Sequence, residues 1–169
     1  MSSEPGKNER FLDTGTKIYD FYDEFLVVCP KCGSMAKVIV DEAEFQKLPQ
    51  KKTQKFRNNF FGPRRLICLG CLHRDFWKGT QIVTGAGVDW YFRLPLWLQI
   101  PCCGEVLWAY NQNYLELLEN YVGAKLRERT KERRSSFLSK LPKWIKSAKN
   151  RDEILKAIKK LKEKLPSAV

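Results

Sequence analysis

Residues 60–79 read FFGPRRLICLGCLHRDFWKG, in which a Cys-Leu-Gly-Cys sequence separates two short apolar runs. Apolar and β-branched residues on both sides of a glycine-containing turn predict a β-hairpin with the two cysteines at its bend. Two other segments repeat this arrangement, EFLVVCPKCGSMAKVIV at residues 24–40 and LWLQIPCCGEVLWAY at residues 96–110. The sequence therefore predicts three hairpins that carry cysteines at their bends.

Two Cys-x-x-Cys pairs supply four candidate metal ligands. Cys29 and Cys32 form the first pair, and Cys68 and Cys71 follow after 35 intervening residues. A two-residue gap lets both sulfurs of one turn face one ion, and four thiolates in a tetrahedron suit Zn²⁺ at a closed, structural site. Because small hairpins bury little core, we expect metal binding to be coupled to folding.

The Cys-Pro-x-Cys-Gly sequence of residues 29–33, followed by a second Cys-x-x-Cys pair, resembles the zinc-ribbon class. That class occurs in transcription factors, RNA polymerase subunits and ribosomal proteins, and the resemblance implies two knuckles that hold one zinc beside a small antiparallel sheet. It covers about residues 24–79, with Leu72 at a position where glycine often stands. Residues 94–111 and 141–158 also resemble a group of uncharacterised bacterial zinc-ribbon-containing proteins, which implies no reaction or substrate.

Other interpretations of the cysteines stay open. A thioredoxin-like redox turn needs one pair at a helix N-terminus, which the β-like surroundings do not favour. His73, the only histidine, could replace one cysteine as a ligand. Adjacent strand residues point to opposite faces, so Cys102 and Cys103 should not easily chelate one ion together. We expect at least one of them to pack in the core, with a second metal or an exchanging ligand as the alternative.

The net charge of +12 is concentrated towards the C-terminus. Residues 121–169 contain 16 Lys and Arg against 5 Asp and Glu, whereas residues 1–120 contain 15 against 14. This asymmetry indicates an acidic partner, most often nucleic acid, although lysine-rich helices can also serve solubility alone. The candidate phosphate contacts are Lys51, Lys52, Lys55, Arg57, Arg64, Arg65, Lys156, Lys159, Lys160 and Lys164.

Aromatic residues accompany the basic ones. The rings of Phe56, Phe60 and Phe61 could stack on bases or pack beneath the insertion that carries them. Trp144 lies in the basic region, where docking onto the β part is favoured over a surface contact. The other tryptophans lie near β-like segments and are expected in the core, namely Trp77, Trp90, Trp97 and Trp108.

The sequence predicts an α+β fold with a small antiparallel zinc-ribbon-like β domain followed by basic α-helices. A polar tail covers residues 1–13, the β domain covers residues 14–112, and the basic helical region covers residues 113–169. An insertion at residues 41–63 is too long for a tight loop, so it should contain a helical turn or an arm.

Two amphipathic helices are expected in the C-terminal region. Asn113-x-x-Glu116 and Asn150-x-x-Glu153 resemble capping boxes, and each precedes an apolar stripe at helical spacing. Residues 126–134 should continue the first helix or link it onward, Ser136 could cap a short turn, and Pro142 should end or restart it. The two stripes consist of Leu115, Leu118, Val122 and Leu126, and of Ile154, Ile158, Leu161 and Leu165.

The motifs exclude the common hydrolase templates. The chain has neither Gly-x-Ser-x-Gly nor His-Glu-x-x-His, and Cys103 with His73 is a minor nucleophile candidate. No apolar run is long enough to span a membrane, and the polar start MSSEPGKNER resembles no signal peptide. Paired cysteines that bind metal suit a reducing compartment, so we expect a cytoplasmic protein.

These observations predict a non-enzymatic zinc-binding protein that contacts DNA or RNA through its basic C-terminal helices. The alternative is a protein–protein interaction adaptor, in which a structural zinc ribbon and amphipathic helices dock an acidic protein partner.

Overall fold

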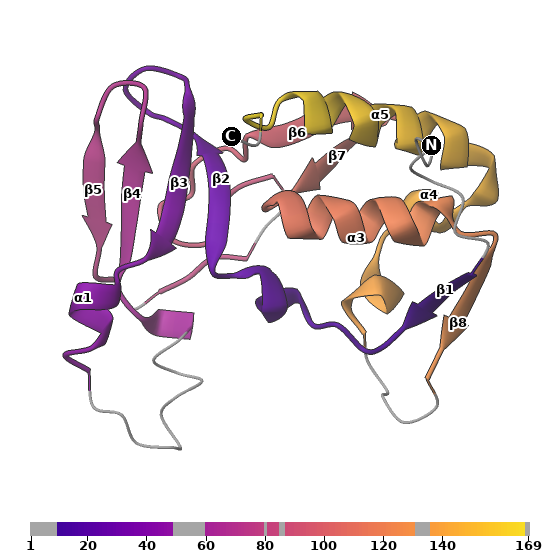
Figure 1. Ribbon diagram of the computed structural model, residues 1–169, viewed down its shortest axis with the longest axis horizontal. Helices are drawn as coiled ribbons and strands as arrows, with labels where there is room; N and C mark the ends of the chain where they lie inside the picture. The colour runs from indigo at the N-terminus through magenta and orange to yellow at the C-terminus, as the bar shows by residue number, and fades with distance from the viewer. Residues whose placement is uncertain (1–9, 49–59, 80, 85–86, 131–135, 168–169) are drawn as a thin grey trace. The chain divides into compact units, whose positions relative to one another are not determined.

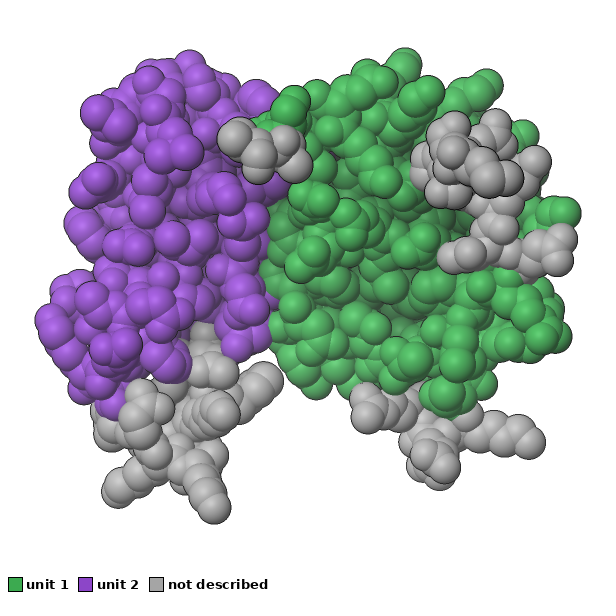
Figure 2. All heavy atoms as spheres, in the orientation of Figure 1, with its two compact units in different colours: residues 1–21, 99–169 green, residues 22–98 purple. Residues whose placement is uncertain are grey.

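The computed structural model describes residues 10–48, 60–79, 81–84, 87–130 and 136–167. The chain forms two compact units, which Figure 2 shows in green and purple. Unit 1 comprises residues 1–21 and 99–169, and unit 2 comprises residues 22–98. Helices and antiparallel sheets occur together, which confirms the predicted α+β class. Within the described residues, no helix has the length and apolar character that a membrane span requires.

Unit 1 combines a β-hairpin, a two-stranded parallel sheet and two main helices (Figure 1). Strands β6 (Leu98–Cys102) and β7 (Glu105–Ala109) form the third predicted hairpin. Helix α3 (Gln112–Gly123) packs against α5 (Arg151–Glu163), and a Lys162–Glu119 ion pair joins them. Short helical segments complete the unit: η1 (Ile18–Phe21), η2 (Phe137–Lys140), α4 (Lys143–Lys146) and η3 (Ala148–Asn150).

Helix α3 confirms most of the first predicted stripe, but it starts and ends earlier than expected. Leu115, Leu118 and Val122 are buried, while Leu126 lies beyond the helix and is 45% exposed. The predicted cap at Asn113 is wrong, because Asn111 occupies that position and its Oδ1 accepts from the Tyr114 N–H at 3.0 Å. The side chain of Asn111 also donates to the Phe21 carbonyl at 3.0 Å, so this cap joins the two chain segments of unit 1.

Strands β1 (Arg10–Asp13) and β8 (Leu126–Arg129) pair in parallel. The sequence pattern instead predicts a polar tail for the first segment and a helix or linker for the second. Arg127 explains the break after α3, because its Nε donates to the Tyr121 carbonyl at 2.9 Å and its Nη1 donates to the Lys146 carbonyl at 2.9 Å. The guanidinium therefore satisfies a carbonyl that the helix end leaves without an intrahelical partner.

Helix α5 confirms the second stripe up to Leu161, with Ile154 and Ile158 also fully buried. Leu165 lies after the helix and is partly exposed. The predicted capping box is wrong, since Asn150 makes no capping hydrogen bond and its Nδ2 donates to the Trp144 carbonyl at 2.9 Å. Ser136 does cap the short helix η2, and α4 begins after Pro142, as expected.

Unit 2 is built on a four-stranded antiparallel sheet of order β2-β3-β4-β5 (Figure 1). The strands are β2 (Glu24–Val28), β3 (Met35–Val40), β4 (Arg64–Cys68) and β5 (Arg74–Trp77). The first two predicted hairpins are therefore present, and β3 pairs with β4 to place them side by side. Residues 99–112, which the sequence pattern places in the β domain, belong instead to unit 1, where Leu107 and Ala109 are buried.

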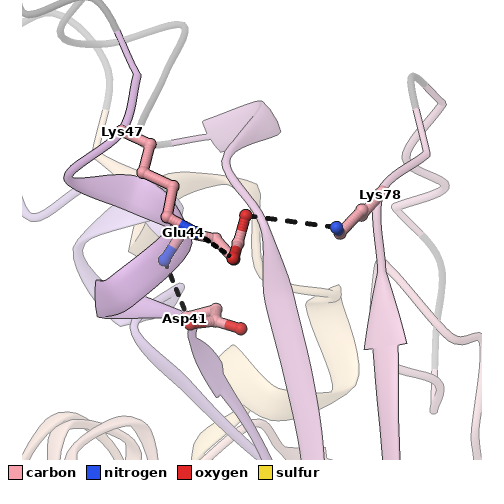
Figure 3. A network of polar contacts seen from close by, with 4 residues as sticks. All are labelled: Asp41, Glu44, Lys47 and Lys78. Carbon is pink, nitrogen blue, oxygen red and sulfur yellow. Dashed lines mark hydrogen bonds and ion pairs between the residues drawn. The ribbon is translucent and has the colours of Figure 1, made fainter.

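The predicted helical turn of the insertion is α1 (Glu42–Phe45). Asp41 caps it, because its Oδ1 accepts from the Glu44 N–H at 3.3 Å. The Glu44 carboxylate forms ion pairs with Lys47 at 2.7 Å and with Lys78 at 4.0 Å (Figure 3). These contacts connect α1 to the residue that follows β5.

Aromatic rings fill the core of unit 2. The ring of Trp90 lies 5.2 Å from that of Phe25 and 5.4 Å from that of Phe60, measured between centroids. Trp77 contacts Tyr91 edge-on at 4.9 Å. Of the four tryptophans expected in the core, Trp90 is fully buried, whereas Trp77, Trp97 and Trp108 are partly exposed.

Asp89 holds the loop that carries two of these rings. Its buried carboxylate accepts backbone N–H bonds from Tyr91 at 2.9 Å, from Phe92 at 2.8 Å and from Leu94 at 2.6 Å. Burial raises the pKa of Asp89, and the three N–H donors lower it in opposition. The carboxylate thus closes the turn before Leu96, which bridges to Val27 of the sheet.

We predict that Asp89→Ala lowers the free energy of unfolding by roughly 2–4 kcal/mol, because three N–H groups lose their acceptor in the interior. Asp23→Ala removes an exposed carboxylate of the same unit and should change stability by less than about 0.5 kcal/mol. Urea denaturation followed by tryptophan fluorescence measures both variants. Equal stabilities of the two variants would show that Asp89 does not hold the loop.

Candidate metal centre and other candidate sites

The two Cys-x-x-Cys turns have the same backbone closure. The Cys29 N–H donates to the Ser34 carbonyl at 2.8 Å, and the Cys68 N–H donates to the His73 carbonyl at 2.9 Å. The residue after each pair adopts a left-handed conformation, with φ of 74° at Gly33 and 61° at Leu72. Leu72 therefore adopts the conformation that glycine provides in the first turn.

The sulfur atoms of Cys29, Cys32, Cys68 and Cys71 all lie within 4.8 Å of one another. Cys29 Sγ is 3.7 Å from Cys71 Sγ, and Cys32 Sγ is 3.6 Å from Cys68 Sγ. A tetrahedron of thiolates with metal–sulfur bonds of about 2.3 Å has edges of about 3.8 Å, whereas a disulfide bond is about 2.05 Å long. The spacing fits ligands of one metal ion, so this cluster could hold a metal.

Local hydrogen bonds favour the thiolate at some positions and not at others. The Lys31 N–H donates to Cys29 Sγ at 3.4 Å. The Ser34 hydroxyl and N–H groups lower the pKa of Cys32 to about 6. The His73 N–H lowers the pKa of Cys71, but burial and the neighbouring thiols raise this pKa by more. The net result is a pKa of about 12. A cation among the sulfurs would favour the thiolate form of all four.

The site is buried on one side, with Cys29 and Cys68 inside and Cys32 and Cys71 exposed. Four protein sulfurs complete a tetrahedral coordination shell and leave no position for a substrate, which is typical of structural sites. His73 does not belong to the set of clustered donor atoms. Its carbonyl instead closes the second turn as that of Ser34 closes the first. Both pairs lie at hairpin bends rather than at helix N-termini, unlike a thioredoxin-like turn.

Arg64 does not qualify as a phosphate contact, which corrects the prediction. Its side chain is 1% exposed, and its guanidinium donates to the Tyr91 hydroxyl at 2.8 Å. The guanidinium also lies 4.5 Å from the ring centroid of Tyr91 and 5.1 Å from that of Tyr22. Arg64 is thus part of the aromatic core, and its neighbour Arg65 is partly exposed.

The four predicted lysines of the C-terminal region are exposed, with Lys156, Lys159 and Lys160 on α5 and Lys164 as its C-cap residue. The three lysines on the helix lie away from the buried stripe. The remaining basic candidates, Lys51, Lys52, Lys55 and Arg57, lie outside the described residues, as does Phe56.

The described aromatic candidates differ in their surroundings. The ring of Phe60 packs against those of Tyr22 and Trp90, so it belongs to the core, whereas Phe61 is exposed. Trp144 is partly buried in unit 1.

An aromatic pocket lies in unit 1, and the sequence patterns do not predict it. It has a volume of about 320 Å³, and its walls include the rings of Tyr19, Trp108 and Tyr114 with Lys17 and Lys140. The rings of Trp108 and Tyr114 are stacked, with centroids 5.8 Å apart. Residues from widely separated segments form the pocket, and no local motif marks it. The only signal is the number of aromatic residues near the third hairpin.

Cys102 and Cys103 differ from the expectation for adjacent strand residues. Cys102 is buried, as predicted for at least one of the pair, and burial raises its pKa to about 12. Cys103 has φ of 54° and lies in the hairpin turn instead of the strand. The two sulfurs are therefore only 3.6 Å apart, and the Glu153 carboxylate joins them in a second group of potential ligands.

No protein-family model matches the chain, and neither does any curated protein or solved structure.

The two left-handed positions generate a paired prediction. Gly33→Ala should lower the free energy of unfolding by about 1 kcal/mol through backbone strain alone, because nothing lies within 4 Å of the added Cβ. Leu72→Gly should raise it by roughly 0.5–1 kcal/mol, since the strain that is relieved exceeds the entropy of glycine and the leucine is exposed. Chemical denaturation of both variants at equal metal content tests this. Destabilisation by Leu72→Gly would mean that the leucine side chain itself is required.

Proposed function

We propose that Cys29, Cys32, Cys68 and Cys71 bind one Zn²⁺ and that unit 2 is a zinc-ribbon-like module. The supporting observation is the sulfur spacing of 3.6–3.7 Å at two equivalent hairpin bends. Thiolates favour zinc over hard cations such as Mg²⁺ and Ca²⁺, and a closed shell makes the metal structural. In this proposal the ion fixes the two knuckles relative to each other.

We also propose that the protein binds nucleic acid without enzymatic activity and with little sequence preference. One observation carries this proposal: Lys156, Lys159 and Lys160 are exposed on α5 away from its buried stripe, and the exposed Lys164 follows the helix as its C-cap residue. Amino groups on one helix face can contact successive phosphates of a nucleic-acid backbone.

The charge distribution and the aromatic pocket give further support. Unit 1 contains 19 Lys and Arg against 12 Asp and Glu, and unit 2 contains 12 against 7, so both units are basic. In unit 1, Lys17 and Lys140 line the same pocket as Tyr19 and Trp108. Aromatic rings beside basic groups are typical of sites that stack unpaired bases and hold phosphates. Single-stranded nucleic acid is therefore the favoured form.

A protein-interaction adaptor is the second candidate function. The observation that favours it is an exposed apolar group on the second hairpin, where Leu69 is 77%, Leu72 is 73% and Phe76 is 58% exposed. Exposed apolar groups of this kind are typical of surfaces that bind another protein. The partner would contact the knuckle and β5, whereas nucleic acid would contact α5.

The metal proposal predicts that Cys29→Ser removes the zinc of this site and the cooperative unfolding of unit 2 together, because the binding free energy contributes to folding. His73→Ala serves as the control and should retain the metal, since its imidazole is not a ligand. Elemental analysis and thermal denaturation of the full chain measure both effects. Protein purified without chelators that held no stoichiometric metal would contradict the proposal.

The nucleic-acid proposal predicts a steep dependence of affinity on salt. With about four to six phosphate contacts, affinity should fall between about 50 and 200 mM salt by roughly 50- to 300-fold for a single-stranded probe, and by roughly a hundred- to a thousandfold for a duplex. Changing Lys156, Lys159, Lys160 and Lys164 to Gln should lower the affinity and reduce the salt slope by about 0.9 for each duplex phosphate that is no longer neutralised. Filter binding with duplex and single-stranded probes measures both quantities.

A matched control separates the α5 surface from net charge. Changing Lys31, Lys37, Lys47 and Lys78 to Gln removes the same charge from described residues of unit 2. This control should retain most of the affinity, and an equal loss in both variants would assign binding to net charge instead of α5. Affinity weaker than about 0.1 mM at low salt for every probe would reject nucleic-acid binding. The adaptor function would then be tested by Leu69→Asp, which should abolish partner binding.

A further inference from the structure

We propose that unit 1 contains a second metal site, formed by Cys102, Cys103 and Glu153, with one coordination position open to solvent. The ligand atoms of the three residues lie within 4.8 Å of one another. Cys102 ends β6, Cys103 lies in the turn between β6 and β7, and Glu153 lies in the first turn of α5. The site is separate from the four-cysteine cluster in unit 2 and would bind its ion independently.

The hairpin turn explains how two adjacent cysteines can bind the same ion. Cys103 and Gly104 have φ of 54° and 76°, and two successive positive values are typical of a two-residue type I′ turn. Because Cys103 is not extended, its sulfur lies on the same side as that of Cys102, at a distance of 3.6 Å. Two thiolates of one tetrahedral ion with bonds of about 2.3 Å are about 3.8 Å apart. The pair therefore needs little rearrangement to chelate a metal.

Glu153 is already held beside this pair. Its Oε1 accepts a hydrogen bond from the Cys103 N–H at 2.8 Å. The carboxylate lies in the first turn of α5, whose buried residues Ile154 and Ile158 fix the helix in unit 1. The hydrogen bond uses one carboxylate oxygen, so the other oxygen can serve as the third ligand.

The donor set selects the class of ion. Two thiolates and one carboxylate favour borderline cations such as Zn²⁺ over Mg²⁺ and Ca²⁺. Each thiol loses its proton to solvent as its sulfur–metal bond forms, so binding releases protons. Cys102 is buried, Cys103 is partly exposed and Glu153 is exposed, so the ion would be reached from the Glu153 side. A fourth ligand would be water, as at zinc sites that bind exchangeable ligands.

The turn also provides a variant that removes a ligand without harming the fold. Asn is among the favoured first residues of a type I′ turn before glycine, so Cys103→Asn should preserve or raise stability while it removes one thiolate. Glu153→Gln keeps an acceptor for the Cys103 N–H and removes the charge. Both variants keep buried Cys102 in place, and denaturation curves establish that they are folded.

The experiment measures zinc stoichiometry of the full chain by equilibrium dialysis and elemental analysis. Wild type should bind two equivalents and Cys103→Asn one, and Glu153→Gln should bind the second equivalent at least tenfold more weakly. With Co²⁺ as the probe, Cys29→Ser should retain a spectrum with weaker thiolate-to-cobalt absorption, because two sulfurs replace four. Equal stoichiometry in wild type and Cys103→Asn would overturn the second site, whatever the number of ions.

The same measurements keep the two metal proposals apart. If wild type binds a single equivalent that is lost in Cys103→Asn but not in Cys29→Ser, the second site is supported and the four-cysteine proposal fails. If that single equivalent is lost in Cys29→Ser but not in Cys103→Asn, the four-cysteine proposal stands and the second site is rejected.

Discussion

Four sulfur atoms lie together where two hairpins end, and as thiolates at that separation they would repel one another strongly unless a cation lay between them. The pairing of β3 with β4 produces this meeting, because Ala36 lies opposite Cys68 and brings the two turns together. Backbone N–H groups of Lys31 and His73 then point at sulfur. The sheet register therefore creates in unit 2 a cluster of four sulfurs that could hold a metal ion.

Away from the cysteines, single polar side chains organise the loops from inside. The Asp89 carboxylate accepts hydrogen bonds from three N–H groups of the turn that carries Trp90 and Tyr91. Asn111 and Arg127 act at the two ends of α3, where each satisfies a backbone group of another segment. Such groups are costly to bury without partners, so each one specifies one loop conformation rather than several.

The sequence predicted the features that depend on local patterns. Hairpins, knuckle cysteines and buried helix stripes follow from alternation, fixed spacing and helical periodicity, and all of these were correctly located except at element ends. Pairing between β1 and β8 depends on residues more than 100 positions apart, as in Arg10 and Leu126, and leaves no local signal. Arg64 has the sequence context of a surface cation, but the rings of Tyr22 and Tyr91 enclose it. The positive φ of Cys103 also leaves no local signal, because the surrounding strand pattern predicts that its side chain points away from that of Cys102.

The division of the chain has a consequence for synthesis on the ribosome. Unit 2 is one continuous segment, whereas unit 1 joins residues 1–21 to residues 99–169. During N- to C-terminal synthesis unit 2 can fold as soon as it emerges, because domains generally fold as units. Phe11 packs against Tyr121, and Phe21 packs against Tyr114. Neither contact can form until these tyrosines have been synthesised. Residues 11–21, which are made before unit 2, thus acquire their native neighbours only after unit 2 has been made.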